Sequence, residues 1–166
     1  MIETIRPWEN NQIIMGKYEK KLKSLGVILP NAPAPAANYV PFVKIDSLVY
    51  VSGQISLGPN GLIKGILGKD MAVEQGKLAA RQCAINLLAQ VKVACDGDLD
   101  RLTQVIKLGG FVNSTPNFFD QPSIINGASD FLVEILGENG RHARTAVGAI
   151  LPLGVAVEID GIFSIK

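Results

Sequence analysis

Arg144 and Glu158 lie in two neighbouring apolar runs near the C-terminus, and their side chains suit the chemistry of a small carboxylate. Arg144 opens the run 144–151, and Glu158 lies in the middle of the run 155–164. The planar guanidinium of an arginine can bind a carboxylate through two hydrogen bonds. A nearby carboxylate can position a water molecule or accept a proton. The pair therefore predicts a site for a small carboxylate-bearing substrate. The alternative is a surface arginine beside a solvent-facing acid.

The two runs that carry these residues are predicted to be strands. The connection 152–154 between them is short, so we expect them to pair as a hairpin. Alternation places Arg144 and Ala146 on one face, where the small neighbour leaves room for a ligand. In the last strand Glu158 and Asp160 share the face opposite the apolar residues. These two carboxylates should therefore meet water or a neighbouring subunit.

The rest of the pattern predicts the elements that position these strands. Apolar residues at steps of three and four indicate a long helix over 71–95 and a second helix over about 122–136. The apolar runs 39–43 and 48–53 are expected to pair as strands, and 105–112 predicts one more. The resulting order, β-β-α-β-α-β-β, predicts an α+β two-layer sandwich in which two main helices cover one face of a mixed sheet.

The chain is expected to divide into an N-terminal segment, 1–38, and one domain, 39–166. Apolar positions at helical spacing predict an amphipathic helix over 10–25, stopped by Gly26. Three prolines between residues 27 and 38 predict an extended arm. The 166 residues are enough for one well-packed core, and 48% of them are apolar.

Composition excludes several classes of function. Sixteen basic and 15 acidic residues give a formal charge of +1, which argues against a nucleic-acid partner. The sequence has no run long enough for a membrane span and no hydrophobic leader, so we expect a cytoplasmic protein without membrane contact. Cys83, Cys95 and the single His142 lack the spacing of a zinc site. No dinucleotide or phosphate-loop motif occurs. We therefore expect no metal and no organic cofactor.

Nucleophilic hydrolysis by a serine is not expected either. No pattern in the sequence places a serine or an acid beside His142, the only histidine.

Several motifs, in the same order along the chain, resemble the YjgF/RidA family, also called the endoribonuclease L-PSP family. The resemblance covers roughly Tyr39 to the C-terminus. The additional N-terminal helix and arm resemble those of a longer subgroup, which also carries Asn126-Gly127-Ala128-Ser129-Asp130 and Gly140-Arg141-His142-Ala143-Arg144. The motifs are Tyr39 followed thirteen residues later by Ser52-Gly53-Gln54, then Asn126, then Ala143-Arg144-Thr145-Ala146-Val147, then Leu151-Pro152, and finally Val157-Glu158-Ile159-Asp160.

The resemblance implies a chorismate-mutase-like fold and a homotrimer with clefts between its subunits. It implies an enamine/imine deaminase, a hydrolase that converts intermediates such as 2-aminoacrylate to 2-keto acids and ammonia without a cofactor. By position, Arg144 would bind the substrate carboxylate, and Glu158 would hold the attacking water with help from the Ala146 backbone. The residues that would line the cleft are Tyr39, Ser52, Gly53 and Asn126.

Two alternatives stay open. One is a trimeric protein that binds keto acids without turnover, and the weakest is the ribonuclease activity that the second family name suggests. The chain also departs from the short family members, because it has one residue fewer between Arg144 and Pro152. Such a deletion either flips the alternation of the strand beyond it or removes a bulge.

Overall fold

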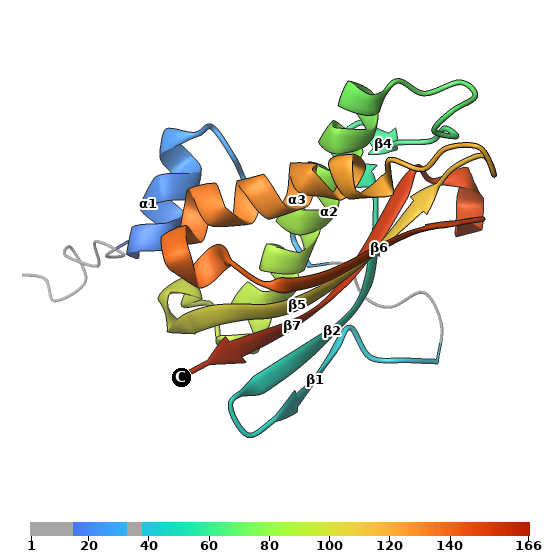
Figure 1. Cartoon of the computed structure of the whole chain (residues 1–166). Coiled ribbons are helices and arrows are strands. Elements are labelled where there is room, and N and C mark those ends of the chain that lie inside the picture. The colour runs from blue at the N-terminus through green and yellow to red at the C-terminus, as the bar shows by residue number, and fades with distance from the viewer. Residues whose placement is uncertain (1–14, 33–37) are drawn as a thin grey trace, which may run out of the picture.

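The computed structural model describes residues 15–32 and 38–166, so the parts of the expected N-terminal helix and arm that fall on 1–14 and 33–37 lie outside the described residues. Figure 1 shows the elements. In chain order they are α1 (Lys17–Ser24), β1 (Phe42–Ile45), β2 (Leu48–Ile55), β3 (Leu57–Gly58), β4 (Gly61–Leu62), α2 (Val73–Ala94), η1 (Leu99–Arg101), β5 (Leu102–Asn113), α3 (Gln121–Leu136), η2 (Gly137–Gly140), β6 (Ala143–Ala149), η3 (Pro152–Gly154) and β7 (Val157–Ile165).

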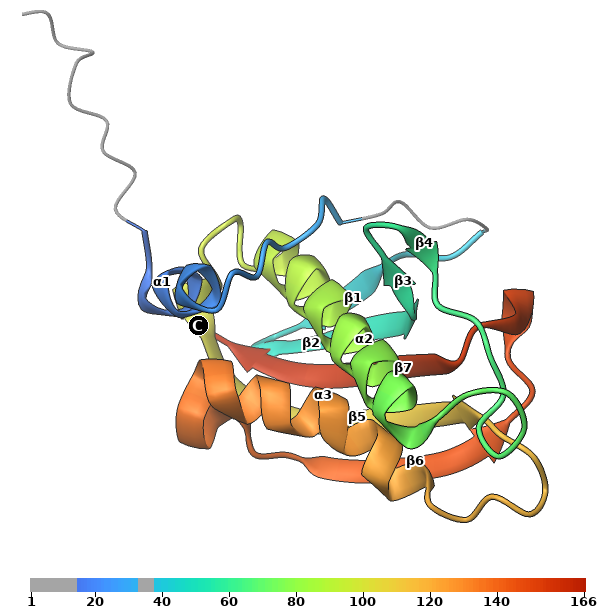
Figure 2. The same ribbon diagram turned by 90° about the horizontal axis from the view of Figure 1, so that it is seen from above.

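A five-stranded mixed sheet forms one layer, and α2 and α3 cover one of its faces (Figures 1 and 2). The strand order is β1-β2-β7-β5-β6, and only β5 and β6 run parallel. A parallel pair needs a crossover, which α3 supplies between β5 and β6. The predicted α+β two-layer sandwich is confirmed.

The predicted hairpin between the last two strands is wrong. β6 pairs only with β5, and β7 lies between β2 and β5. The connection does not reverse beside β6 but crosses the end of β5, where the Asn113 backbone N–H donates to the Ala156 carbonyl at 2.9 Å. Burial explains the order. Val157, Ile159 and Phe163 of β7 are fully buried and need the covered centre of the sheet, whereas β6 takes the exposed edge.

The helix predicted over 71–95 is confirmed as α2, and its apolar stripe forms the centre of the core. Six residues of that stripe are fully buried: Ala80, Cys83, Ala84, Leu87, Leu88 and Val91. The second predicted helix is confirmed as α3, which begins at Gln121. Within the described ranges no helix is both long enough and apolar enough to cross a membrane.

The described part of the N-terminal helix, α1, packs onto the same core through Tyr18 and Leu22. The Asp100 carboxylate accepts hydrogen bonds from the backbone N–H groups of Lys17 and Tyr18 at 2.7 and 3.0 Å. These bonds satisfy donors that the first turn of a helix leaves unpaired. The helix ends before Gly26, whose φ of 67° suits a glycine.

Candidate functional site

Arg144 lies at the centre of a polar group between β6 and α3, which we call the α3–β6 cluster. Its Nη1 donates to Asn126 Oδ1 at 2.8 Å and to Ser129 Oγ at 3.1 Å. Asn126 and Ser129 are three residues apart, so both lie on the side of α3 that faces Arg144. Within the described chain no carboxylate oxygen lies within 4.0 Å of the Arg144 guanidinium.

His142 joins this cluster through Ser129. The His142 Nδ1 lies 2.6 Å from the Gly140 carbonyl oxygen, and Nε2 lies 3.0 Å from Ser129 Oγ. Because a carbonyl oxygen can only accept, the proton of the neutral ring is on Nδ1, and Nε2 accepts from the Ser129 hydroxyl. Burial, together with the Arg144 charge, lowers the pKa of His142 although the Gly140 bond raises it. The expectation that no serine lies beside His142 is therefore wrong.

The edge strand β6 is regular. Its seven residues pair with consecutive residues of β5, from Lys107 opposite Ala143 to Asn113 opposite Ala149, without a shift of register. The alternation predicted for Arg144 and Ala146 thus holds, and both face the helices, since Ala146 packs against the core. The residue that is absent relative to the short members leaves no bulge in this strand.

Glu158 lies on the opposite face of the sheet in a second group, which we call the β2–β7 cluster. A register shift between Val51 and Gln54 of β2 places Gly53 beneath the Glu158 side chain, and a Cβ at position 53 would collide with Glu158 Oε1. The Ser52 hydroxyl donates to the Val40 carbonyl at 2.7 Å. This bond holds the segment that follows Tyr39, whose side chain is 51% exposed.

The carboxyl group of Glu158 is partly buried and has a raised pKa. Burial is the main cause of the raised pKa of Glu158, and the negative charge of Asp160 raises this pKa further. Asp160 lies beside it on the same uncovered face, where its Oδ1 accepts from the Gly109 backbone N–H at 3.2 Å. No described basic side chain lies within 4.0 Å of Glu158. A carboxyl with a raised pKa and no ion pair is suited to exchange a proton with a reacting group.

The two clusters do not meet within one chain. Glu158 lies level with Phe111 and Val147 across the sheet, whereas Arg144 lies level with Leu108. Their backbones are therefore separated by two strand spacings of about 4.8 Å and three residues of about 3.3 Å each, and their side chains lie on opposite faces. Of the seven predicted site residues, the structure groups Arg144 with Asn126 and Ala146 on the helix-covered face. On the other face Gly53 lies against Glu158, and Ser52 precedes Gly53 in the chain. Tyr39 is linked to this group only through its neighbour Val40, whose carbonyl accepts from Ser52.

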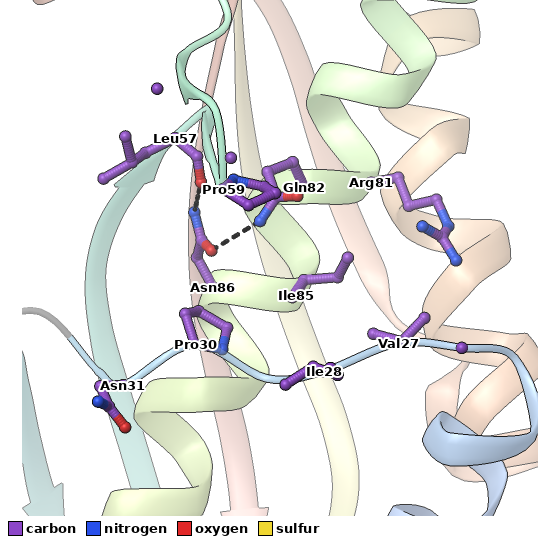
Figure 3. A pocket seen from close by; sticks show the side chains of 13 residues that line it. Val27, Ile28, Pro30, Asn31, Leu57, Pro59, Arg81, Gln82, Ile85 and Asn86 are labelled. Carbon is purple, nitrogen blue, oxygen red and sulfur yellow. Dashed lines mark hydrogen bonds between the residues drawn. The ribbon is translucent and has the colours of Figure 1, made fainter.

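A pocket of about 750 Å³ lies elsewhere, between α2, the β3–β4 hairpin and residues 26–31 (Figure 3). Its lining is mainly apolar and includes Ile85 of α2 together with the polar side chains of Gln82 and Asn86. Gln82 donates to Asn86, which in turn donates to the carbonyls of residues 55 and 57. None of the seven predicted site residues lines this pocket.

The described residues contain no group of three or more histidine, cysteine or acidic side chains that could hold a metal ion. Both cysteines are buried and unbridged. Burial raises the pKa of the Cys83 thiol well above its ordinary value, so this thiol stays protonated and packs as a small apolar group.

The fold and the order of the motifs agree with a family match over most of the chain. The sequence model of the family described as "YjgF/chorismate mutase-like, putative endoribonuclease" matches residues 19–159. This protein belongs to that family.

Three proteins are similar to this chain over most of its length. Protein TCP17 of Trypanosoma cruzi is 44% identical over 157 residues, which cover 93% of this chain and 98% of that protein. The crystal structure of Atu1372, a protein of unknown function from Agrobacterium tumefaciens, is 48% identical with a TM-score of 0.84, covering 90% of this chain and 92% of that one. A 2-iminobutanoate/2-iminopropanoate deaminase of Dermatophagoides farinae is 29% identical over 140 residues, covering 82% of this chain and 93% of that protein.

Proposed function

We propose that this protein hydrolyses reactive imines and enamines of the 2-aminoacrylate type to 2-keto acids and ammonia. The observation that supports this proposal is the way in which the Arg144 guanidinium is held. Two hydrogen bonds from Nη1 hold its guanidinium, and no described carboxylate pairs with it. An arginine held in this way is ready to bind the carboxylate of a small substrate. The similarity to a relative named as an imine deaminase supports the reaction class.

The chemistry needs little beyond positioning. An enamine rearranges to its imine, whose carbon is already electrophilic. Glu158 accepts a proton from water as the oxygen bonds to that carbon, and this proton then passes to the imine nitrogen, which regenerates the carboxylate. In the resulting carbinolamine the hydroxyl proton moves to the nitrogen, the C–N bond breaks to release ammonia, and the carbonyl forms. Holding the carboxylate and the water in place converts an encounter of two molecules into a reaction within one complex.

The two clusters would come together between subunits. We propose a homotrimer in which the α3–β6 cluster of one subunit lies against the β2–β7 cluster of the next. Two features support this arrangement. Arg144 lies on an edge strand, and the sheet face that carries Glu158 has no helix over it (Figure 1). A neighbouring subunit on that face would bury the Glu158 carboxyl further and raise its pKa more.

The test is the release of 2-keto acid from an imine that an amino-acid oxidase generates in situ. We expect the wild-type protein to accelerate release, and Arg144→Ala and Glu158→Gln to abolish the acceleration. Arg141→Ala is the matched control, because the Arg141 side chain is exposed and bonds only Glu138 in the described chain, and the change leaves the Arg141 backbone in place. Equal acceleration by wild type and Arg144→Ala would refute the proposal.

Binding of a 2-keto acid without turnover is the second candidate function. The separation of Arg144 from Glu158 favours it, because carboxylate binding at Arg144 does not require Glu158. In that case no amino-acid-derived imine would be hydrolysed faster. Calorimetry would then show that Glu158→Gln keeps the affinity for 2-oxobutanoate and Arg144→Ala loses it.

A further inference from the structure

The α3–β6 cluster contains two residues, Ser129 and His142, to which the proposed reaction assigns no role. They form an unbroken chain of hydrogen bonds with Arg144. The Arg144 Nη1 donates to Ser129 Oγ at 3.1 Å, and the Ser129 hydroxyl donates to His142 Nε2 at 3.0 Å. The His142 Nδ1 donates to the Gly140 carbonyl at 2.6 Å. Only one direction of donation satisfies every group in this series of hydrogen bonds, so the position of each proton is defined.

The far end of this chain is anchored by tight packing. Gly140 is buried, and a Cβ at that position would lie 2.8 Å from Val133 Cα on α3. The next residue, Arg141, is held by its carbonyl, which accepts from Gln104 Nε2 at 2.6 Å. The carbonyl that receives the His142 proton is therefore fixed against both α3 and β5. A fixed carbonyl selects the tautomer of His142 and hence the direction of the Ser129 hydroxyl.

At the other end of this series of hydrogen bonds, the contacts of Arg144 determine which edge of its guanidinium remains available to bind a ligand. Both hydrogens of the Arg144 Nη1 are used, one by Asn126 and one by Ser129. The Nε and Nη2 hydrogens donate to no residue in the described ranges. A guanidinium binds a carboxylate with two parallel N–H groups, and the Nε/Nη2 edge has that geometry.

We propose that Ser129 and His142 are positioning residues, which hold Arg144 so that its Nε/Nη2 edge receives the substrate carboxylate. The inference rests on the proposed function, because it concerns the same arginine. The neutral ring that the chain requires agrees with the lowered pKa of His142, whose causes are burial first and then the Arg144 charge. Besides each other, the side chains of Ser129 and His142 hydrogen-bond only Arg144 and the Gly140 carbonyl among the described residues, so neither is assigned a bond-making step.

Paired variants test this role through the split between KM and kcat for imine hydrolysis. Ser129→Ala and His142→Leu should raise KM about tenfold, the effect of losing one hydrogen bond to a charged group, and should lower kcat less. Ser129→Thr and His142→Gln keep a hydroxyl and an acceptor, so they should restore KM to within about threefold of wild type. Ser123→Ala is the matched control, because the Ser123 hydroxyl of α3 bonds Asp120 outside the cluster.

The nitrogen-15 spectrum of the imidazole gives an independent readout, because His142 is the only histidine. We expect the Nδ1–H tautomer at pH 7 in the wild type. In Ser129→Ala the Gly140 carbonyl should keep this tautomer, and the Nε2 signal should shift because Nε2 loses its hydrogen-bond donor. Addition of 2-oxobutanoate should shift the imidazole signals of the wild type but not those of Arg144→Ala. An equal mixture of tautomers, or a KM unchanged in Ser129→Ala and His142→Leu, overturns the inference while Arg144→Ala remains inactive. If Arg144→Ala keeps full activity, the proposed function fails as well.

Discussion

Single residues decide where the two acidic side chains of β7 can lie. Each lies over a glycine of a neighbouring strand, Glu158 over Gly53 of β2 and Asp160 over Gly109 of β5. A Cβ at position 109 would lie 2.5 Å from Asp160 Oδ1. Because these two glycines have no side chain, the uncovered face has space for both carboxylates. The glycine of the Ser52-Gly53-Gln54 motif therefore has a steric function.

Gly53→Ala should displace the Glu158 carboxylate and reduce imine hydrolysis about as strongly as Glu158→Gln does. The carboxylate is the far end of a flexible side chain, so the fold should lose less than about 1 kcal/mol of stability. Gly58→Ala is the control, because a Cβ there would find its first neighbour at an ordinary 3.7 Å. The measurement is kcat/KM together with a urea unfolding curve. Wild-type activity in Gly53→Ala would contradict a role for this contact.

The pH dependence of imine hydrolysis should reflect the pKa of Glu158 and the effect of Asp160 on it. A base acts when it is deprotonated, so a raised pKa of Glu158 places the acidic limb of kcat/KM above the range of an ordinary glutamate. Asp160→Asn removes a negative neighbour and should lower the pKa of Glu158, which moves that limb to lower pH. Glu134→Gln, an exposed change on α3, should leave the profile unmoved. A limb that moves to higher pH in Asp160→Asn would contradict this electrostatic account.

At the scale of elements, α2 and α3 cross so closely that the contact requires a glycine. A Cβ at Gly127 would lie 2.7 Å from the carbonyl carbon of Lys77 and 2.8 Å from its Cα. The sequence Asn126-Gly127 looks unsuited to a helix interior, yet both residues lie within α3. The glycine lets the helices approach, and Asn126 beside it bonds Arg144. One dipeptide thus sets the helix packing and part of the candidate site.

Gly127→Ala should destabilise the fold although alanine is the better helix former. The propensity gain of about 1 kcal/mol is smaller than the cost of overpacking against backbone, so we expect a net loss of about 1–3 kcal/mol. Urea denaturation measures the change through the unfolding midpoint. Asp130→Ala, an exposed change in the same helix, should stay within about 0.5 kcal/mol of wild type. A midpoint at or above that of the wild type would show that the helices separate easily.

At the scale of the whole molecule, one face of the sheet is left without a covering layer (Figures 1 and 2). The apolar side chains on this face include Tyr50 and Val147, which are 41% and 42% exposed. Ile162 lies opposite Tyr50 on the neighbouring strand, and Phe111 lies beside Val147. Exposed apolar side chains gathered over several strands favour association with another protein surface. Under the proposed function that surface belongs to the other subunits of the trimer.

Tyr50→Lys should break this association by placing a charge in the apolar face. Light scattering at micromolar concentration should give three times the chain mass for the wild type and a smaller mass for the variant. Imine hydrolysis should fall with it, since the two clusters would separate. Leu78→Lys, on the exposed side of α2, should keep both mass and activity. A wild-type monomer that is fully active would refute the shared site.

Local patterns in the sequence are enough to predict the main helices and strands and the faces that they bury. The stripe from Ala80 to Val91 predicts α2 because helical spacing gathers apolar groups on one side, and burying that side drives folding. Alternation likewise assigned Arg144 and Ala146 to one face of β6 and Glu158 to the uncovered face. These properties are local, since each depends on residues a few positions apart.

Local patterns do not define which strands are neighbours or which distant side chains meet. Alternation defines the faces of a strand but not its partner, so it could not exclude a hairpin in place of the order β7-β5-β6. Ser129 lies in α3 and His142 lies just before β6, so they meet only because α3 crosses from β5 to β6. The same order separates Arg144 from Glu158 within one chain. Strand order depends on which faces bury the most apolar surface together, a property of the complete fold.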